Sequence, residues 1–339
     1  MALDRSILPD GLSVRVVVAF RNEEACLPLL LSSLSRQSFP FFELVLVDDH
    51  SDDDGLVLAE RFASHFPSSA VLRSDGVGKK AALRKGIAHV GSAVSSSDVL
   101  IVTTDADCVV PDGWVEAVVR SFISSATHFL IGPVRLRGSS FQALEWMSLQ
   151  AVTRLTALYF YPVLCNGANL AFRRSEFLRF CDSSSILGSQ CASGDDVFLL
   201  QTFRRFRLPV TYLNSRFGIV DTFAPSSISS FFRQRFRWVR KTKSFHMSFS
   251  LFLAGGVLCL CIIMILMLFL DLRCYLFLNL SLLVFELPLF LRQAWWFCQW
   301  TSLLWLPVWQ LLYPFYVLFC TLGGWIVAPR WKGRIVRNG

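Results

Sequence analysis

The stretch VLIVTTDAD, residues 99–107, decides the fold class of this chain. Its first four residues have the composition of a buried β-strand, and the strand runs into a turn that carries Asp105 and Asp107. Residues 14–20 and 43–47 repeat the strand pattern and end in RNEE and DDHS. Continuous apolar strands separated by helical spacing are typical of a largely parallel sheet that helices cover on both faces. We therefore predict an α/β domain whose ligands lie at the carboxyl ends of the strands.

Positive charge is concentrated in a short band. Residues 1–199 hold 17 Lys and Arg against 22 Asp and Glu, whereas residues 200–243 hold 10 against the single Asp221. Only Asp271 and Glu286 are acidic after residue 248. A basic band directly before apolar segments favours contact with anionic lipid headgroups or anionic substrates. No nucleic-acid recognition motif occurs, and we expect no nucleic-acid partner.

Three long apolar runs occupy the C-terminal part of the chain. They are residues 249–270, 275–291 and 295–327. The first has no charge and is long enough to cross a bilayer core of about 30 Å. The second is broken by Glu286 and Pro288, and the third is too long for one ordinary crossing and short for two. Because the tail after residue 329 is basic, we expect it in the cytosol, an even number of crossings, and part of the apolar region lying flat on the membrane.

The N-terminus and the cysteines indicate a cytosolic α/β domain. MALDRSILPDGLS has no apolar core of the length that a signal peptide needs. The ten cysteines contain no C-x-x-C pair, and we interpret them as reduced thiols. We expect a multi-pass membrane protein with its α/β domain in the cytosol, and a bacterial inner membrane as its location. The expected domains are residues 1–226 (α/β), 227–248 (basic amphipathic interface helix), 249–329 (transmembrane or interfacial helices) and 330–339 (basic cytosolic tail).

The acidic turn, residues 105–107, suits a hard cation. Carboxylates on a turn can bind Mg²⁺ or Mn²⁺, which also holds diphosphate oxygens and neutralises the charge of a departing nucleoside diphosphate. D-x-D turns also occur by chance on many surfaces. The position of Asp105 and Asp107 directly after an apolar strand favours the metal-binding hypothesis.

Two other loops are candidates for nucleotide contacts. Asp48 and Asp49 directly follow a strand, where an acid can accept hydrogen bonds from a base or a ribose, whereas residues 52–54 fit a solvated loop. GVGKK, residues 76–80, places flexible glycines beside two lysines and forms either a phosphate cradle or a plain loop, since the spacing is not that of a P-loop.

Two predicted helices carry further candidates. Asp195 and Asp196 precede an apolar helical start, where an aspartate either favours the positive helix N-terminus or takes a proton from an acceptor hydroxyl. Apolar residues in 228–239 follow helical spacing with basic residues between them, which predicts an amphipathic helix on a membrane surface. On this helix Gln234, Arg237 and Trp238 share one face and can grip a diphosphate and a sugar ring or acceptor, although a plain basic anchor explains the pattern too.

Taken in order, seven segments resemble family 2 of the inverting glycosyltransferases, especially its membrane-bound members. The segments are VVVAFRNEE, VDDHSDD, GKKAALRKGI, TTDADC, CNGANLAFRR, SGDDVFLL and QRFRW. The likeness spans residues 14–243. It implies a GT-A fold, which is a Rossmann-like nucleotide-sugar-binding sheet with helices on both faces, followed here by the amphipathic interface helix and C-terminal transmembrane helices.

The resemblance also implies roles for single residues. Asp49 would contact the nucleobase, Lys79 would lie near the nucleotide, Asp105 would hold the nucleotide-sugar and the metal, Asp107 the metal, and Asp196 would be the base. Gln234, Arg237 and Trp238 would form a QxxRW element beside the diphosphate and the acceptor. Asp195 stands where many relatives have Glu, and Arg84 where many have Asn, which leaves the contacts of that loop open.

The expected reaction is an inverting transfer of a sugar from a nucleotide-sugar, with UDP as the expected nucleotide, to a hydroxyl of a lipid-linked or glycan acceptor at the membrane. The alternatives are a polyprenyl-phosphate sugar synthase, a processive polysaccharide synthase, and a membrane protein that binds a glycan or nucleotide without turnover. The apolar tail offers too few crossings to enclose a polar pore, so we expect one or a few sugars to be added.

Overall fold

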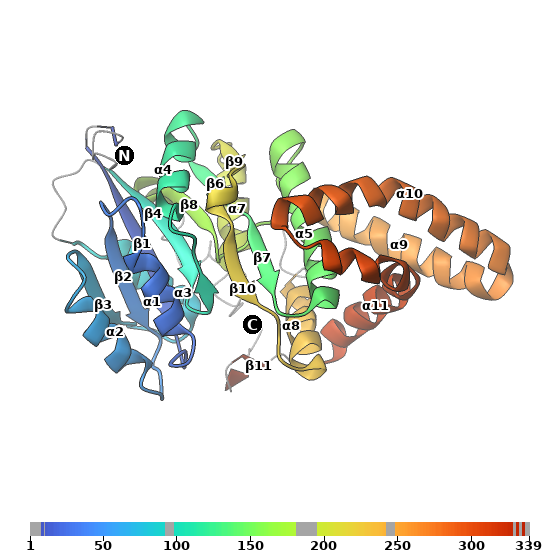
Figure 1. The fold of residues 1–339 in the computed structure, drawn as a ribbon, viewed down its shortest axis with the longest axis horizontal. Coiled ribbons are helices and arrows are strands. Elements are labelled where there is room, and N and C mark those ends of the chain that lie inside the picture. Colours follow the sequence, from blue (N-terminus) through green and yellow to red (C-terminus); the bar gives the residue numbers. More distant parts are fainter. Residues whose placement is uncertain are drawn as a thin grey trace. The chain divides into compact units, whose positions relative to one another are not determined.

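The computed structural model describes residues 8–9, 11–91, 98–180, 195–241, 248–327, 330–331 and 334–335 (Figure 1). The chain forms two compact units. The first unit is Met1–Val134, Arg154–Phe223 and Asn338–Gly339, and the second is Arg135–Thr153 and Ala224–Arg337. The domain boundaries expected at residues 226, 248 and 329 stay predictions.

A seven-stranded mixed sheet with the order β3-β2-β1-β4-β8-β6-β9 forms the centre of the first unit. Its strands are β1 (Leu12–Phe20), β2 (Glu43–Asp48), β3 (Ser69–Arg73), β4 (Asp98–Asp105), β6 (Phe129–Ile131), β8 (Leu170–Arg173) and β9 (Val210–Tyr212). The first four strands in this order run parallel, β8 runs antiparallel to β4 and β6, and β9 runs parallel to β6. The three expected strands and their parallel arrangement are therefore confirmed, whereas the antiparallel β8 had no signal in the sequence.

The register of the central strands brings their acidic ends to one edge of the sheet. Ala19 of β1 pairs with Val47 on one side and with Asp105 on the other, and Phe20 pairs with Asp48. The last residues of β1, β2 and β4 thus lie side by side. The loops that follow these strands must start from the same place.

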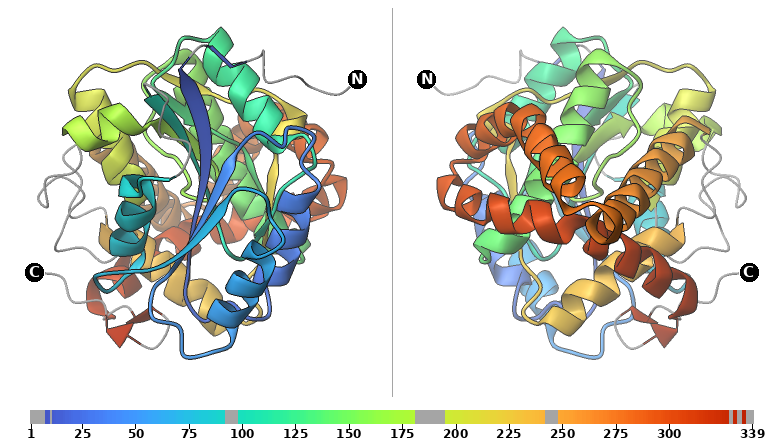
Figure 2. Two further views of the ribbon diagram at one scale, coloured as in Figure 1. Left: turned by 90° about the vertical axis from the view of Figure 1, so that its left-hand side faces the viewer. Right: turned by 90° about the vertical axis from the view of Figure 1, so that its right-hand side faces the viewer.

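Helices cover both faces of the sheet. Helix α3 (Lys79–Ala88) lies on one face, and α1 (Leu27–Ser35) and α2 (Gly55–Ala63) lie on the other (Figure 2). Alternate residues of β1 and β2, such as Val17 and Val45, are fully buried and share a core cluster with residues of α3. The α/β fold class with helices on both faces is confirmed. The remaining elements of this unit are β5 (Cys108–Val109), α4 (Trp114–Ser124), α6 (Arg174–Phe180), α7 (Asp195–Arg205), η2 (Arg216–Gly218) and β10 (Val220–Phe223).

The second unit is mostly helical. It follows β7 (Val134–Arg137) and contains the first part of α5 (Ser140–Tyr159), with the unit boundary inside that helix. Its other elements are α8 (Ile228–Lys241), α9 (Ser248–Leu270), α10 (Leu272–Phe297), η4 (Trp300–Trp305), α11 (Leu306–Ile326), β11 (Arg330–Trp331) and β12 (Arg334–Ile335). Figure 1 shows α9 and α10 side by side, with the single residue Asp271 between them.

Three helical segments are long and apolar enough to cross a membrane: Ser250–Leu270, Leu272–Phe297 and Trp300–Ile326. Helix α10 continues through Glu286 and Pro288, so the break in the second apolar run does not break the helix. A proline removes one backbone donor, which an apolar helix tolerates when its other bonds remain. The third run contains the end of α10, the short η4 and α11, which explains its intermediate length.

Candidate active site

The two acids after β2 have different partners. Asp48 Oδ1 accepts a hydrogen bond of 2.9 Å from the Ser51 backbone N–H, and Arg73 Nε lies 3.5 Å from Asp48 Oδ2, so Asp48 holds its own loop. Asp49 Oδ1 accepts a hydrogen bond of 2.7 Å from the backbone N–H of Gly78. Burial raises the pKa of Asp49, and the Gly78 hydrogen bond opposes that shift. Asp49 therefore joins the end of β2 to the start of α3.

Lys79 continues this connection to the next strand end. Its Nζ lies 2.5 Å from Asp105 Oδ1, the last residue of β4. Gly78, directly before it, has φ +104°, a conformation that glycine adopts without strain. The structure thus brings the predicted residues Asp49, Lys79 and Asp105 together at the carboxyl edge of the sheet.

Asp107 is exposed on the turn between β4 and β5. The thiol of Cys108, which follows it, lies 3.7 Å from Asp107 Oδ1. Burial, followed by the charges of Asp107 and Asp105, raises the pKa of Cys108 well above its ordinary value. The thiol therefore stays protonated and donates toward the carboxylate.

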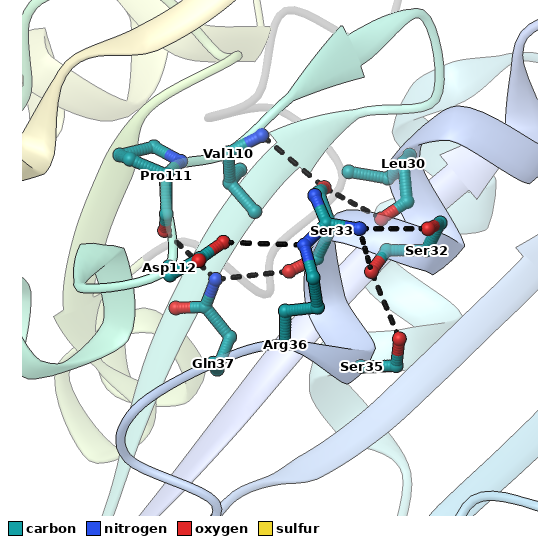
Figure 3. Close-up of polar contacts among 9 residues, drawn as sticks. All are labelled: Leu30, Ser32, Ser33, Ser35, Arg36, Gln37, Val110, Pro111 and Asp112. Carbon is teal, nitrogen blue, oxygen red and sulfur yellow. Dashed lines mark hydrogen bonds and ion pairs between the residues drawn. The ribbon is translucent and has the colours of Figure 1, made fainter.

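The chain directly after the acidic turn is fixed by the end of α1 (Figure 3). Ser33 Oγ accepts a 3.2 Å hydrogen bond from Val110 N–H, and Gln37 Nε2 donates a 2.8 Å bond to the carbonyl of Pro111. Gln37 Oε1 also accepts a 3.0 Å bond from Val115 N–H at the start of α4. These polar contacts fix the backbone that follows the acidic turn, and they therefore help to fix the positions of Asp105 and Asp107.

The donor atoms of the acidic turn fit a hard divalent cation. Asp105 and Asp107 supply carboxylate oxygens, which Mg²⁺ and Mn²⁺ prefer. Among the described residues no group of three His, Cys, Asp or Glu could hold a metal ion. Two carboxylates alone would leave several coordination positions for diphosphate oxygens and water, which is the usual arrangement for Mg²⁺ at nucleotides.

Asp196 lies at the start of α7 and is linked to β4. Its Oδ1 accepts a 2.8 Å bond from the N–H of the next residue, Val197, and its Oδ2 lies 3.4 Å from Gly167 N. The carbonyl of Gly167 in turn accepts a 3.1 Å bond from Thr103 Oγ1, two residues before Asp105. Asp196 thus lies near the start of α7 and is connected to β4 through Gly167, and its role as the base stays a prediction. The side chain of Asp195 lies outside the described residues.

Asp196 also lines a pocket of the first unit together with two cations, Lys80 and Arg84. The other lining residues are Leu83, Ile87, Thr103, Gly167, Leu170, Phe172, Phe177 and Leu199. Arg84, which departs from the family pattern, therefore lines the same pocket as the candidate base. Its positive charge can attract an anionic ligand.

The QxxRW element belongs to the second unit. Gln234, Arg237 and Trp238 lie on α8 and are half-buried. Gln234 Oε1 accepts a hydrogen bond from Arg235 Nη1. The ring of Trp238 packs at 5.9 Å from that of Trp146, measured between centroids. These residues are thus grouped on one helix, while the other predicted site residues are grouped in the first unit.

Sequence reasoning missed the role of Asn169, within the motif CNGANLAFRR. Its Oδ1 accepts a 3.0 Å bond from Trp114 Nε1, and its Nδ2 donates bonds of 2.8 Å to the carbonyls of Pro133 and Gly218. Asn169 is buried and joins three segments that are far apart in the sequence. The one sequence signal for Asn169 is its place in this motif. Its hydrogen-bond partners are distant in the sequence, so local spacing does not predict them.

The chain also matches a known protein family. Residues 15–180 match the profile of Glycosyl transferase family 2. Two relatives named N-acetylglucosaminyltransferase, from Rhizobium leguminosarum bv. viciae and Rhizobium meliloti, are 25% and 23% identical over 68% and 67% of this chain. The chain covers 55% and 54% of those proteins, about half of their length.

Solved structures also resemble the chain. TarS 1-349 of S. aureus in complex with UDP-GlcNAc is 16% identical, covers 67% of this chain and 64% of its own, and has a TM-score of 0.48. Mannosyltransferase PcManGT from Pyrobaculum calidifontis in complex with GDP-Man and Mn²⁺ is 16% identical. The match covers 67% of this chain and 61% of the mannosyltransferase chain, with a TM-score of 0.47. The family match at residues 15–180 and the named relatives together support a glycosyltransferase of family 2.

Proposed function

We propose that the chain moves a sugar from a UDP-sugar to a hydroxyl of a lipid-linked or glycan acceptor at a membrane, with inversion at the anomeric carbon. One observation carries the proposal. The contacts from Asp49 to Gly78 and from Lys79 to Asp105 join the ends of β2 and β4 through the start of α3. This edge offers an acid for the base or ribose, a cation for phosphate, and carboxylates for a metal.

In the proposed reaction Asp196 accepts the proton of the acceptor hydroxyl as the oxygen attacks the anomeric carbon. The new carbon–oxygen bond forms while the bond to the diphosphate oxygen breaks, and the nucleoside diphosphate leaves with the bonding electrons. Lys79 is proposed to hold the diphosphate by charge, and a contribution from the QxxRW residues Gln234 and Arg237 stays the prediction that the family resemblance implies. Mg²⁺ or Mn²⁺, bound at Asp105 and Asp107, would neutralise charge on the departing group.

The names of the relatives favour N-acetylglucosamine as the transferred sugar, so UDP-N-acetylglucosamine is the first donor to test. The three apolar segments and the basic helix α8 support an acceptor at the membrane. A cytosolic catalytic domain belongs to the same proposal. We propose addition of one or a few sugars.

A donor screen with the purified protein tests this function. UDP and GDP sugars are each offered with a hydroxyl acceptor, a polyprenyl phosphate, or neither, and the release of nucleoside diphosphate is measured. We expect release from a UDP-sugar with a hydroxyl acceptor, and a loss of about 10²-fold or more in Asp196→Asn with donor affinity retained. Transfer by this variant at the parent rate would remove Asp196 as the base. Transfer to the polyprenyl phosphate alone would favour the synthase alternative, and donor binding without any turnover would refute the proposal.

A further inference from the structure

We infer that Arg235 is a positioning residue that fixes the QxxRW element, a role that rests on the function proposed above. Arg235 lies on α8 between Gln234 and Arg237, and only 3% of its surface is exposed. A buried arginine keeps its charge at any physiological pH and therefore needs partners. Its contacts with α5, with α11 and with other residues of α8 all lie within the second unit.

The guanidinium of Arg235 is held by Glu145 of α5. Arg235 Nε lies 3.1 Å from Glu145 Oε1, and Nη2 contacts Glu145 Oε2, so the ion pair is bidentate. Tyr316 Oη of α11 donates a further hydrogen bond of 2.8 Å to Glu145 Oε1. Bidentate pairing fixes both the place and the plane of a guanidinium. Two other helices thus determine where the Arg235 side chain lies.

The faces of the same guanidinium contact two aromatic rings of α8. Its central carbon lies 4.0 Å from the ring centroid of Phe231 and 4.5 Å from that of Trp238. A cation over an indole face is attractive, and the attraction increases when both groups are shielded from water. Trp238 is therefore placed between Arg235 and Trp146. Its ring orientation depends on a residue at one of the two unspecified positions of QxxRW.

The remaining terminal nitrogen of Arg235 orients Gln234. Arg235 Nη1 donates to Gln234 Oε1, and because arginine has donors only, this contact selects the carbonyl end of the amide. The NH₂ end of Gln234 is then the end that can serve a ligand. An anionic diphosphate oxygen accepts from such a group. Arg235 thus sets the orientation of both Gln234 and Trp238 while its own nitrogens are used within the protein.

A double-mutant cycle between Arg235→Lys and Gln234→Ala tests the inference. Lysine keeps the charge but cannot pair with Glu145 in a bidentate way and reach Gln234 at the same time. The measurements are UDP affinity, and kcat and KM for transfer, in the parent, both single variants and the double variant. Arg233→Lys is the matched control, because Arg233 is an exposed arginine on the same helix that donates a hydrogen bond to Ser229, and lysine keeps its charge.

We expect Arg235→Lys to lower UDP affinity and transfer by roughly tenfold, as for the loss of one charge-assisted hydrogen bond, and to add little once Gln234 is alanine. Tyr316→Phe leaves the ion pair in place and should lower UDP affinity and transfer by a smaller factor. It is therefore the second test of the inference if the Arg235→Lys protein does not fold. Two outcomes would overturn the positioning role and leave the proposed function intact. In the first, the effects of Arg235→Lys and Gln234→Ala on UDP affinity and transfer multiply as for independent residues. In the second, Gln234→Ala lowers UDP affinity and transfer but Arg235→Lys does not. If Gln234→Ala itself changes nothing, the proposed QxxRW function fails and the inference fails with it.

Discussion

Gly78 and Lys79 are neighbours in the chain, and each contacts an acid from a different strand end. Gly78 uses its backbone N–H toward Asp49, and Lys79 uses its side chain toward Asp105. A diphosphate that binds near the acidic turn would compete with Asp105 for Lys79 Nζ. At the scale of single residues, the site therefore holds a cation that an anionic ligand can attract.

Asp107→Ala should weaken donor binding that depends on a divalent cation, because removing a carboxylate leaves Mg²⁺ or Mn²⁺ with one hard ligand fewer. We expect a decrease of roughly tenfold or more in donor affinity, the factor for a charge-assisted contact of about 1.5–3 kcal/mol. The measurement is UDP-sugar affinity with and without a chelator.

Asp112→Ala is the matched control for this variant. Asp112 is an exposed acid on the same segment, and its carboxylate contacts Arg36 rather than the acidic turn. Its substitution should leave the chelator effect as in the parent. A chelator effect of the same size in Asp107→Ala would show that any metal binds elsewhere.

Residue identity could be predicted from the sequence where a residue stands next to a strong local pattern. Asp49 and Asp105 follow apolar strands, and both lie at the predicted edge. Asp48 and Asp49 stand side by side at the end of β2, and local sequence does not determine which partner each side chain contacts. Glu145 and Arg235 are 90 residues apart, so no spacing rule connects them.

At the scale of elements, the apolar patterns located the central strands and α8, but not the sheet order. The strands β6, β8 and β9 have only three or four residues each, and their pairing joins distant parts of the chain. Short strands carry little periodicity, and long-range pairing is fixed by packing rather than by local preference.

Gly86 shows how closely α3 packs on the sheet. A Cβ at this position would lie 2.6 Å from Val17 Cγ1 and 3.0 Å from Val47 Cγ2. Gly86→Ala should therefore lower the free energy of unfolding by about 1–3 kcal/mol through overpacking, less the gain from better helix propensity. Because Lys79 begins the same helix, donor affinity should decrease as well. Thermal unfolding and UDP affinity are the measurements.

Gly255→Ala is the control for Gly86→Ala, since Gly255 lies in α9 and a Cβ there would meet no atom within 4 Å. It should leave UDP affinity unchanged and should not lower the stability, because only the gain in helix propensity applies there. Val17→Ala should cost less stability in the Gly86→Ala background than in the parent, because it removes the methyl group that meets the new Cβ. Strictly additive effects would contradict the proposed close contact.

At the scale of the whole molecule, the helices of the second unit differ in what they pack against. Helix α11 lies along the basic helix α8, where Phe319 meets Phe232 at 4.9 Å between ring centroids and Gly323 leaves room for Phe236. Tyr316, near the middle of α11, bonds the buried Glu145. A helix that contacts a basic surface helix and an ion pair along its length is expected in the membrane interface. Helices α9 and α10 have no such partner among the described contacts and are expected to cross as a hairpin.

This arrangement predicts opposite locations for two exposed cysteines at the ends of α10. Cys274 follows the turn at Asp271 between α9 and α10, and Cys298 follows the last residue of α10. If α9 and α10 cross the bilayer and α11 lies flat, Cys298 is on the side of α8 and of the catalytic residues, and Cys274 is on the other side. The measurement is labelling of single-cysteine variants by a membrane-impermeant maleimide, in vesicles whose nucleotide-sugar site faces outward. We expect Cys298 to react at once and Cys274 to react only after the vesicles are permeabilised. Immediate labelling of both cysteines would mean that α10 does not cross, and α9 and α10 would then have to lie in the interface beside α11.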